Sequence, residues 1–130
     1  MTKGIFLILM ILSFVSPVCA DRLSSYYEKQ NFYIEECERE DGKISIEFSI
    51  PVHPESVTRE NIRINGLPLP KAIQIFFNRR GDRILFSELP QWQNEILCIE
   101  ISSVTSCLGN PMIPIPAFYL APGDELEWED

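Results

Sequence analysis

The sequence lacks most of the residues from which catalytic and metal sites are built. It has a single histidine, His53, and no two cysteines stand in a C-x-x-C spacing, so a zinc site has little support. It also has no G-x-S-x-G turn to present a serine nucleophile. We therefore predict that the protein is not an enzyme, with no catalytic residues, no metal ligands and no cofactor.

Basic side chains are also scarce. Lys and Arg number 11 against 19 Asp and Glu, which gives a formal net charge of −8 at pH 7. An acidic surface repels phosphate groups, so nucleic acid and anionic lipid are not expected as partners. The charge does not identify a positively charged partner, because acidity commonly serves solubility.

Residues 1–20 have the pattern of a secretory signal peptide. Lys3 precedes an apolar run over residues 4–15, which is short for a membrane span, and small residues then lead to a cleavage point before Asp21. An uncleaved anchor and lipidation of Cys19 remain alternatives, although Ser16 and Val18 fit a lipoprotein signal poorly. We expect a secreted or periplasmic protein, bound to the membrane only if Cys19 is lipidated.

No stretch shows helical periodicity over three turns, whereas short alternating runs recur along the chain. In residues 43–50, Ile44, Ile46, Phe48 and Ile50 alternate with Lys or polar side chains, as in a strand buried on one face. Asp41-Gly42 and Asn65-Gly66 are hairpin turn signals. About seven short strands of this kind predict an all-β fold, an antiparallel β-sandwich of two sheets. The expected inward residues are Phe32, Ile34, Ile44, Ile46, Phe48, Ile62, Ile64, Ile75, Phe77, Ile84, Phe86, Leu97, Ile99, Ile101 and Val104.

The predicted organisation is one domain. After the signal peptide we expect an N-terminal arm (residues 21–30), the sandwich (31–120) and an acidic, mobile tail (121–130), in which Leu126 and Trp128 could pack. The last strand of the sandwich is expected in residues 112–120, with Ile113, Ile115, Ala117 and Tyr119 on one face. Its prolines would block a central ladder, so we expect an edge strand or an extended cover.

Cleavage of the signal peptide would leave three cysteines: Cys37, Cys98 and Cys107. Three cysteines cannot all pair within one chain, and export permits disulfides. We therefore predict one disulfide among them and one free thiol, and the sequence does not say which two cysteines pair.

Three segments resemble bacterial Ig-like domains of the S-layer-protein type. They are FSIPVHPESVTRENI at residues 48–62, GDRILF at 81–86 and VTSCLGNPM at 104–112. The resemblance implies an Ig-like sandwich, and it implies no single activity. One departure is Ser106, which stands where such domains often carry an aspartate that organises the loop.

The "FSxPV" strand also resembles that of periplasmic copper-carrier sandwiches. Copper sites need clustered imidazole or soft ligands, whereas His53 is alone and Met112 is the only methionine beyond the signal peptide. Our leading expectation is therefore a non-enzymatic bacterial module that binds another envelope or extracellular protein, or acts as a scaffold at the cell envelope. A metal carrier, and an accessory or inhibitor subunit of an exported enzyme, are the alternatives.

Two charged segments are candidate sites. Arg79, Arg80, Gly81, Asp82 and Arg83 form a predicted hairpin tip whose Arg-Gly-Asp resembles an integrin-binding motif. A tip commonly needs glycine and polar neighbours, so a solvated tip is the expected role, with protein binding by this loop as the alternative. The acids Glu35, Glu36, Glu38, Glu40 and Asp41 lack the spacing of a calcium loop and are expected to form a solvated acidic sheet edge.

Overall fold

The computed structural model describes residues 31–129. The predicted signal peptide, Cys19 and the arm at residues 21–30 lie outside this range. Within it, no helix is long and apolar enough to cross a membrane.

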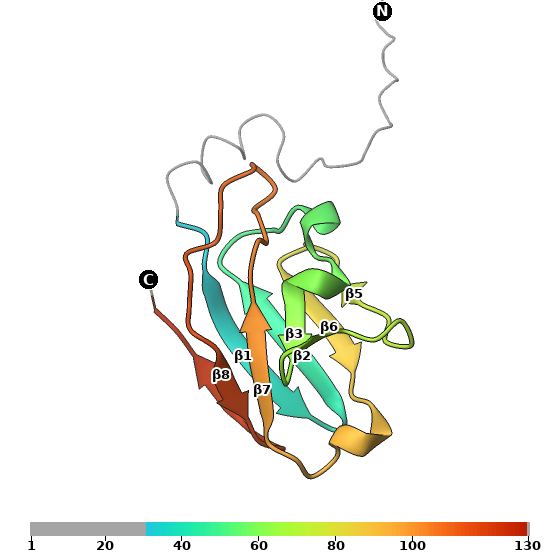
Figure 1. Ribbon diagram of the computed structural model, residues 1–130. Helices are drawn as coiled ribbons and strands as arrows, with labels where there is room; N and C mark the ends of the chain where they lie inside the picture. The colour runs from blue at the N-terminus through green and yellow to red at the C-terminus, as the bar shows by residue number, and fades with distance from the viewer. Residues whose placement is uncertain (1–30, 130) are drawn as a thin grey trace, which may run out of the picture.

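The described residues form two antiparallel sheets, which confirms the predicted all-β sandwich (Figure 1). One sheet has the order β5-β6-β2-β1-β9 and the other the order β4-β3-β7-β8. The strands are β1 (Ile34–Glu40), β2 (Lys43–Phe48), β3 (Ile62–Ile64), β4 (Leu67–Pro68), β5 (Phe76–Phe77), β6 (Arg83–Ser87), β7 (Leu97–Ile101), β8 (Phe118–Leu120) and β9 (Glu125–Glu127). Three short 3-10 turns join them: η4 (Pro54–Ser56), η5 (Arg59–Asn61) and η6 (Pro90–Trp92).

The β1–β2 hairpin forms where the sequence predicts it. Asp41 and Gly42 have φ of 56° and 75°, which is the backbone of a type I′ turn and matches the twist of the flanking strands. Strand β2 then pairs with β1 and β6, and its side chains alternate in burial as the sequence predicts. Ile44, Ile46 and Phe48 are buried between the sheets.

A bulge in β1 changes which residues of the acidic run face the core. The pairing with β2 shifts register between Ile34 and Glu36. An extra residue reverses the alternation that follows it, so Cys37 and Arg39 are buried instead of Glu36 and Glu38. The predicted acidic edge is also wrong, because β9 pairs with β1 and covers that edge.

The predicted core is confirmed except at two positions. Ile75 is only partly buried, and Phe77 is 40% exposed. In this part of the chain only Phe76 and Phe77 pair with β6, and they do so at the edge of the sheet. An edge strand that short has few neighbours to cover its side chains.

The C-terminal part differs most from prediction. Of the expected strand 112–120, only Phe118–Leu120 forms a strand. Its buried face is opposite to the expected one, because Tyr119 is 68% exposed and Leu120 is fully buried. Pro111, Pro114 and Pro116 cannot donate to a ladder, so pairing with β7 begins only after them. The acidic tail is also part of the domain, since β9 joins the larger sheet and Leu126 and Trp128 pack against the core.

The two sides of the sandwich, where the sheets present their edge strands, are built differently. β8 and β9 are edges of different sheets joined by residues 121–124, and we call this side the closed flank. Each sheet has two edges, so β4 and β5 lie on the opposite side, which we call the open flank. There the connection is residues 69–75, of which Leu69 and Ile73 are buried.

Candidate functional site

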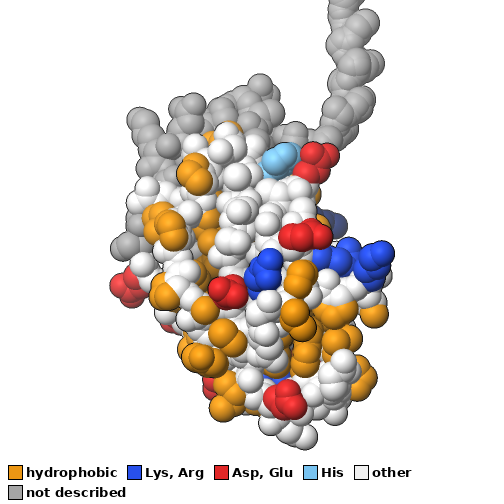
Figure 2. Space-filling model, in the orientation of Figure 1, with side chains coloured by type: hydrophobic (Ala, Val, Ile, Leu, Met, Phe, Trp, Pro, Cys, Tyr) orange, Lys and Arg blue, Asp and Glu red, His pale blue; other side chains and the backbone are white. Residues whose placement is uncertain are grey.

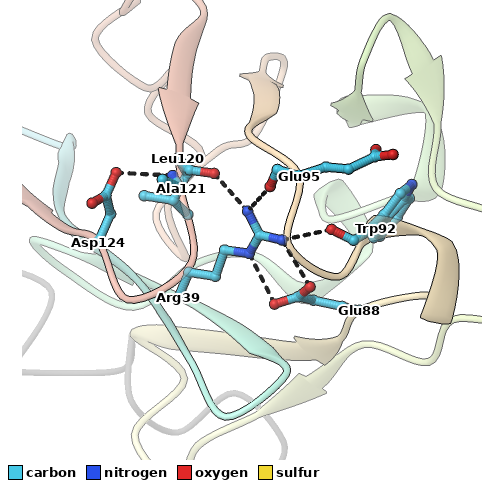
Figure 3. Close-up of polar contacts among 7 residues, drawn as sticks. All are labelled: Arg39, Glu88, Trp92, Glu95, Leu120, Ala121 and Asp124. Atoms are coloured by element: carbon cyan, nitrogen blue, oxygen red, sulfur yellow. Dashed lines mark hydrogen bonds and ion pairs between the residues drawn. The ribbon is translucent and has the colours of Figure 1, made fainter.

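The most buried charged group is Arg39, at the closed flank (Figure 3). Its Nε and Nη2 donate to the two carboxylate oxygens of Glu88, each at 2.9 Å. Nη2 also donates to the Trp92 carbonyl at 2.8 Å, and Nη1 donates to the carbonyls of Glu95 and Leu120 at 2.6 and 2.7 Å. All five N–H groups of the guanidinium therefore have an acceptor.

These contacts occupy every hydrogen-bond donor of the Arg39 guanidinium, so none is left to bind a substrate. Both partners of the ion pair are almost fully buried, and no buried side-chain N or O atom in residues 31–129 lacks a hydrogen-bond partner. The backbone of Arg39 also binds the turn between β8 and β9: its N–H donates to the Asp124 carbonyl, and its carbonyl accepts from Gly123. Arg39 is thus a structural link between the sheets.

The three segments that carry the family resemblance meet at one end of the sandwich. The Val52 N–H donates to the Gly81 carbonyl, and the Cys107 N–H donates to the Pro51 carbonyl, both at 2.9 Å. The hydroxyl of buried Ser106 accepts from the N–H groups of Leu108 and Asn110. The Ser106 hydroxyl therefore organises this loop through two backbone N–H groups.

Neither the histidine nor the described methionine is placed as a metal ligand would be. His53 is exposed and its backbone N–H donates to the Thr105 carbonyl. Met112 is buried in the core. The Ser106 hydroxyl, bound to two backbone N–H groups, is not positioned as a nucleophile with a base beside it.

The disulfide prediction is not met among the described residues. Cys37 and Cys98 are both free thiols, so no two of Cys37, Cys98 and Cys107 are joined to each other. Cys37 faces the core because of the β1 bulge. Burial, and then the charge of Glu36, raises the pKa of its thiol to about 12, so the reactive thiolate is not formed near neutral pH.

The predicted binding loop at residues 79–83 lies against the sheet instead of standing clear of it. Gly81, with φ of 79°, and Asp82 use their carbonyls to accept from β2 and the chain after it. The Asp82 carboxylate accepts from the Asn78 amide at 2.7 Å and pairs with Arg80 at 3.1 Å. Arg83 turns to the face of the sheet and pairs with Glu47 at 2.6 Å. Only Arg79 and Arg80 extend into solvent.

Acidic side chains converge on the outer face of the larger sheet. A shallow groove of about 280 Å³ is lined by Tyr33, Glu35, Glu36, Glu47, Glu127, Trp128 and Glu129. Beside it, carboxylate oxygens of Glu36, Glu125 and Glu127 lie within 4.8 Å of one another. Oxygen ligands suit hard cations such as Ca²⁺, yet Glu125 and Glu127 are exposed, and exposed acidic groups are common without an ion.

The pKa values of Glu35 and Glu36, which line this groove, are both raised. For Glu36 the largest cause is a hydrogen bond shared with Glu125, followed by partial burial and the charge of Glu125. For Glu35 the largest cause is burial, followed by the charges of Glu47 and Asp82. Arg83, 3.6 Å from Glu36, offsets part of the repulsion.

The open flank exposes large apolar side chains. Phe76 is 52% and Leu67 68% exposed, on the edge strands β5 and β4. A hollow of about 620 Å³ lies along the segment that joins these strands, and it is lined by Val57, Thr58, Arg59, Glu60, Lys71 and Ile75. Exposed apolar groups beside unpaired strand edges are features of protein-binding surfaces.

The open flank is also the basic part of an acidic protein. Residues 61–81 contain Arg63, Lys71, Arg79 and Arg80 and no acidic residue. Figure 2 shows Lys and Arg side chains next to hydrophobic ones on the side where Figure 1 places β5. Sequence reasoning found only the Arg79–Arg80 end of this surface, because its strands come together only in the fold.

No protein-family model matches the chain, and no curated protein or solved structure matches it. The fold alone therefore defines the class: an all-β protein of two antiparallel sheets, one of five strands and one of four.

Proposed function

We propose that this chain is a non-enzymatic bacterial Ig-like module, exported to the cell envelope, that binds another protein through its open flank. The observation that carries the proposal is the exposure of Phe76, Phe77 and Leu67 on edge strands. Each large apolar side chain that a partner covers contributes about 1.5–3 kcal/mol. An edge strand also offers unpaired backbone groups to an added strand.

The closed flank gives the contrast that supports this choice. There Phe118 and Trp128 pack edge to face, with ring centroids 5.0 Å apart, and Leu126 packs on the core. Phe118 and Trp128 on the closed flank thus stabilise the domain, whereas Phe76 and Phe77 on the open flank are left to solvent. Aromatic side chains are enriched at protein interfaces.

The Ig-like assignment is supported by the loop end of the sandwich. The residues that carry the resemblance, far apart in the sequence, bind one another there through backbone hydrogen bonds such as His53 N–H to the Thr105 carbonyl. These contacts give a structural reason for the separate segments to occur together in one sequence. Export to the envelope is supported by the signal-peptide pattern of residues 1–20.

Site-specific photo-crosslinking in cells tests the proposal. A photoreactive phenylalanine analogue is placed at Phe76 and, as a matched control, at Tyr119, which is also aromatic, exposed and on an edge strand, but on the closed flank. We expect a defined protein adduct at position 76 that is at least tenfold stronger than at position 119. Equal labelling at the two positions, or no adduct at position 76, would contradict the proposal.

A further inference from the structure

Charge of opposite sign is segregated to opposite edges of the five-stranded sheet. At the β5 edge, residues 69–81 carry three basic side chains, Lys71, Arg79 and Arg80, and no acidic one, and Arg79 lies two residues after β5. At the β9 edge, Glu125, Glu127 and Glu129 are exposed, and no Lys or Arg occurs after Arg83 in the sequence. One chain therefore presents two edges of complementary charge.

Both edges also have backbone groups that point away from the sheet. In β9, the Asp124 carbonyl and the Trp128 N–H bind β1, so the alternation of an antiparallel strand turns the backbone of Glu125 and Glu127 outward. In β5, the Asn78 N–H binds the Arg83 carbonyl, so the backbone of Phe77 points outward by the same alternation. Each edge can accept a further strand.

We propose that copies of this protein associate head to tail, with the open flank of one copy against the β9 edge of the next. The five-stranded sheets then continue from copy to copy. Lys71 and Arg79 approach the glutamates of β9, and Phe77, which is on the same face of the sheet as buried Ile84, is covered beside Leu126 and Trp128 of the next copy. The inference rests on the proposed function, because it names the protein that the open flank binds.

The geometry of this contact decides the kind of assembly. Its two surfaces differ, so each bound copy still has one free surface of each kind, and growth continues unless the rotation closes a ring. The ion pairs lie at exposed edges, where salt screens them. Association is therefore expected to be weak, dependent on concentration and reversed by salt.

Charge exchange tests the proposal on the full chain, expressed with its own leader. The first variant is Lys71→Glu/Arg79→Glu, which leaves Arg80 in place because it pairs with Asp82. The second is Glu125→Lys/Glu127→Lys, which removes repulsion within the acidic cluster. Sedimentation velocity over a hundredfold range of protein concentration, at low and high salt, gives the assembly state, and circular dichroism checks folding of each variant.

We expect the unmodified protein to assemble at low salt and to dissociate at high salt. Each variant alone should associate at least tenfold more weakly, because its two flanks then carry the same sign of charge. An equimolar mixture of the two folded variants should recover association, because opposite charges face each other again. If the second variant does not fold, the first variant is mixed with unmodified protein. Its β9 edge should bind the open flank of an unmodified copy and its own open flank should bind none, so the assemblies of unmodified protein stop growing and their mean mass falls.

A monomeric unmodified protein at every concentration and salt, or assembly that neither variant weakens, would overturn the proposal. Its failure is distinct from failure of the proposed function. If Phe76 crosslinks to a different protein while the chain stays monomeric, the open flank is a binding surface and the partner is not a second copy. If Phe76 yields no adduct and the chain is monomeric, both proposals fail.

Discussion

The closed and open flanks differ in how the chain passes between the sheets. On the closed flank, four residues carry the chain from β8 to β9, and Arg39 binds this turn through its backbone and Leu120 through its side chain. On the open flank, residues 69–75 cross with only Leu69 and Ile73 buried, and both edge strands have two residues. One flank therefore holds the domain together, whereas the other leaves its edge strands and large apolar side chains uncovered.

The largest effect should come from Arg39. Arg39→Met leaves the buried Glu88 carboxylate and three carbonyls without their donors, and breaking a buried pair costs about 3–5 kcal/mol. Urea unfolding measures the loss of free energy of unfolding. Arg63→Met is the control, because the Arg63 side chain is exposed and donates to the Gly66 carbonyl; its expected cost is below about 0.5 kcal/mol. Equal costs for the two variants would refute the structural role of Arg39.

An intermediate effect is expected from the aromatic side chains of the two flanks. Trp128→Ala removes the edge-to-face contact with Phe118 and uncovers part of the core, at a cost of about 1–3 kcal/mol. Phe76→Ala, on the open flank, should change the free energy of unfolding by no more than about 0.5 kcal/mol while it weakens partner binding. Thermal unfolding compares them, and a Phe76 variant as unstable as the Trp128 variant would erase the distinction between the flanks.

The smallest effect concerns pH and the acidic groove. The raised pKa of Glu36 means that the fold favours its protonated form. The stabilisation that protonated Glu36 gives the folded state is complete below the ordinary pKa of 4.5. It is lost as the pH rises through the raised pKa of Glu36. Glu36→Gln should therefore flatten the rise in the free energy of unfolding that is expected as the pH falls through the raised pKa of Glu36 toward 4.5. Glu55→Gln, which removes an exposed carboxyl on η4, is the control, and an identical pH profile for both variants would contradict this account.

Local rules predicted the parts of the fold that depend on neighbouring residues. The alternation in 43–50, the Asp41-Gly42 turn and the inward face of β7 all follow from residues adjacent in the sequence. The predictions that failed depend on residues far apart in the sequence. The β1 bulge that buries Arg39 is set by the partner strand and by acceptors as distant as Leu120, and no pattern within residues 34–40 indicates it.

The candidate surface was partly visible in the sequence. The loop at residues 79–83 was identified by its charge and glycine, yet Asp82 and Arg83 are engaged within the domain and only its first two arginines face solvent. A usable signal was the absence of acidic residues from 61–81 in a chain with 19 of them. The exposure of Phe77 could not be foreseen, because its alternation with Ile73 and Ile75 is that of a buried strand.

The contacts of Arg39 also bear on the order of folding. Its acceptors lie 49 to 81 residues further along the chain, and contacts of such long range form late and slow the folding of a domain. Its guanidinium is therefore not fully bound until the chain has been made as far as Leu120. We expect a growing chain to stay loosely structured until then, which is the state required for the export that its first twenty residues predict.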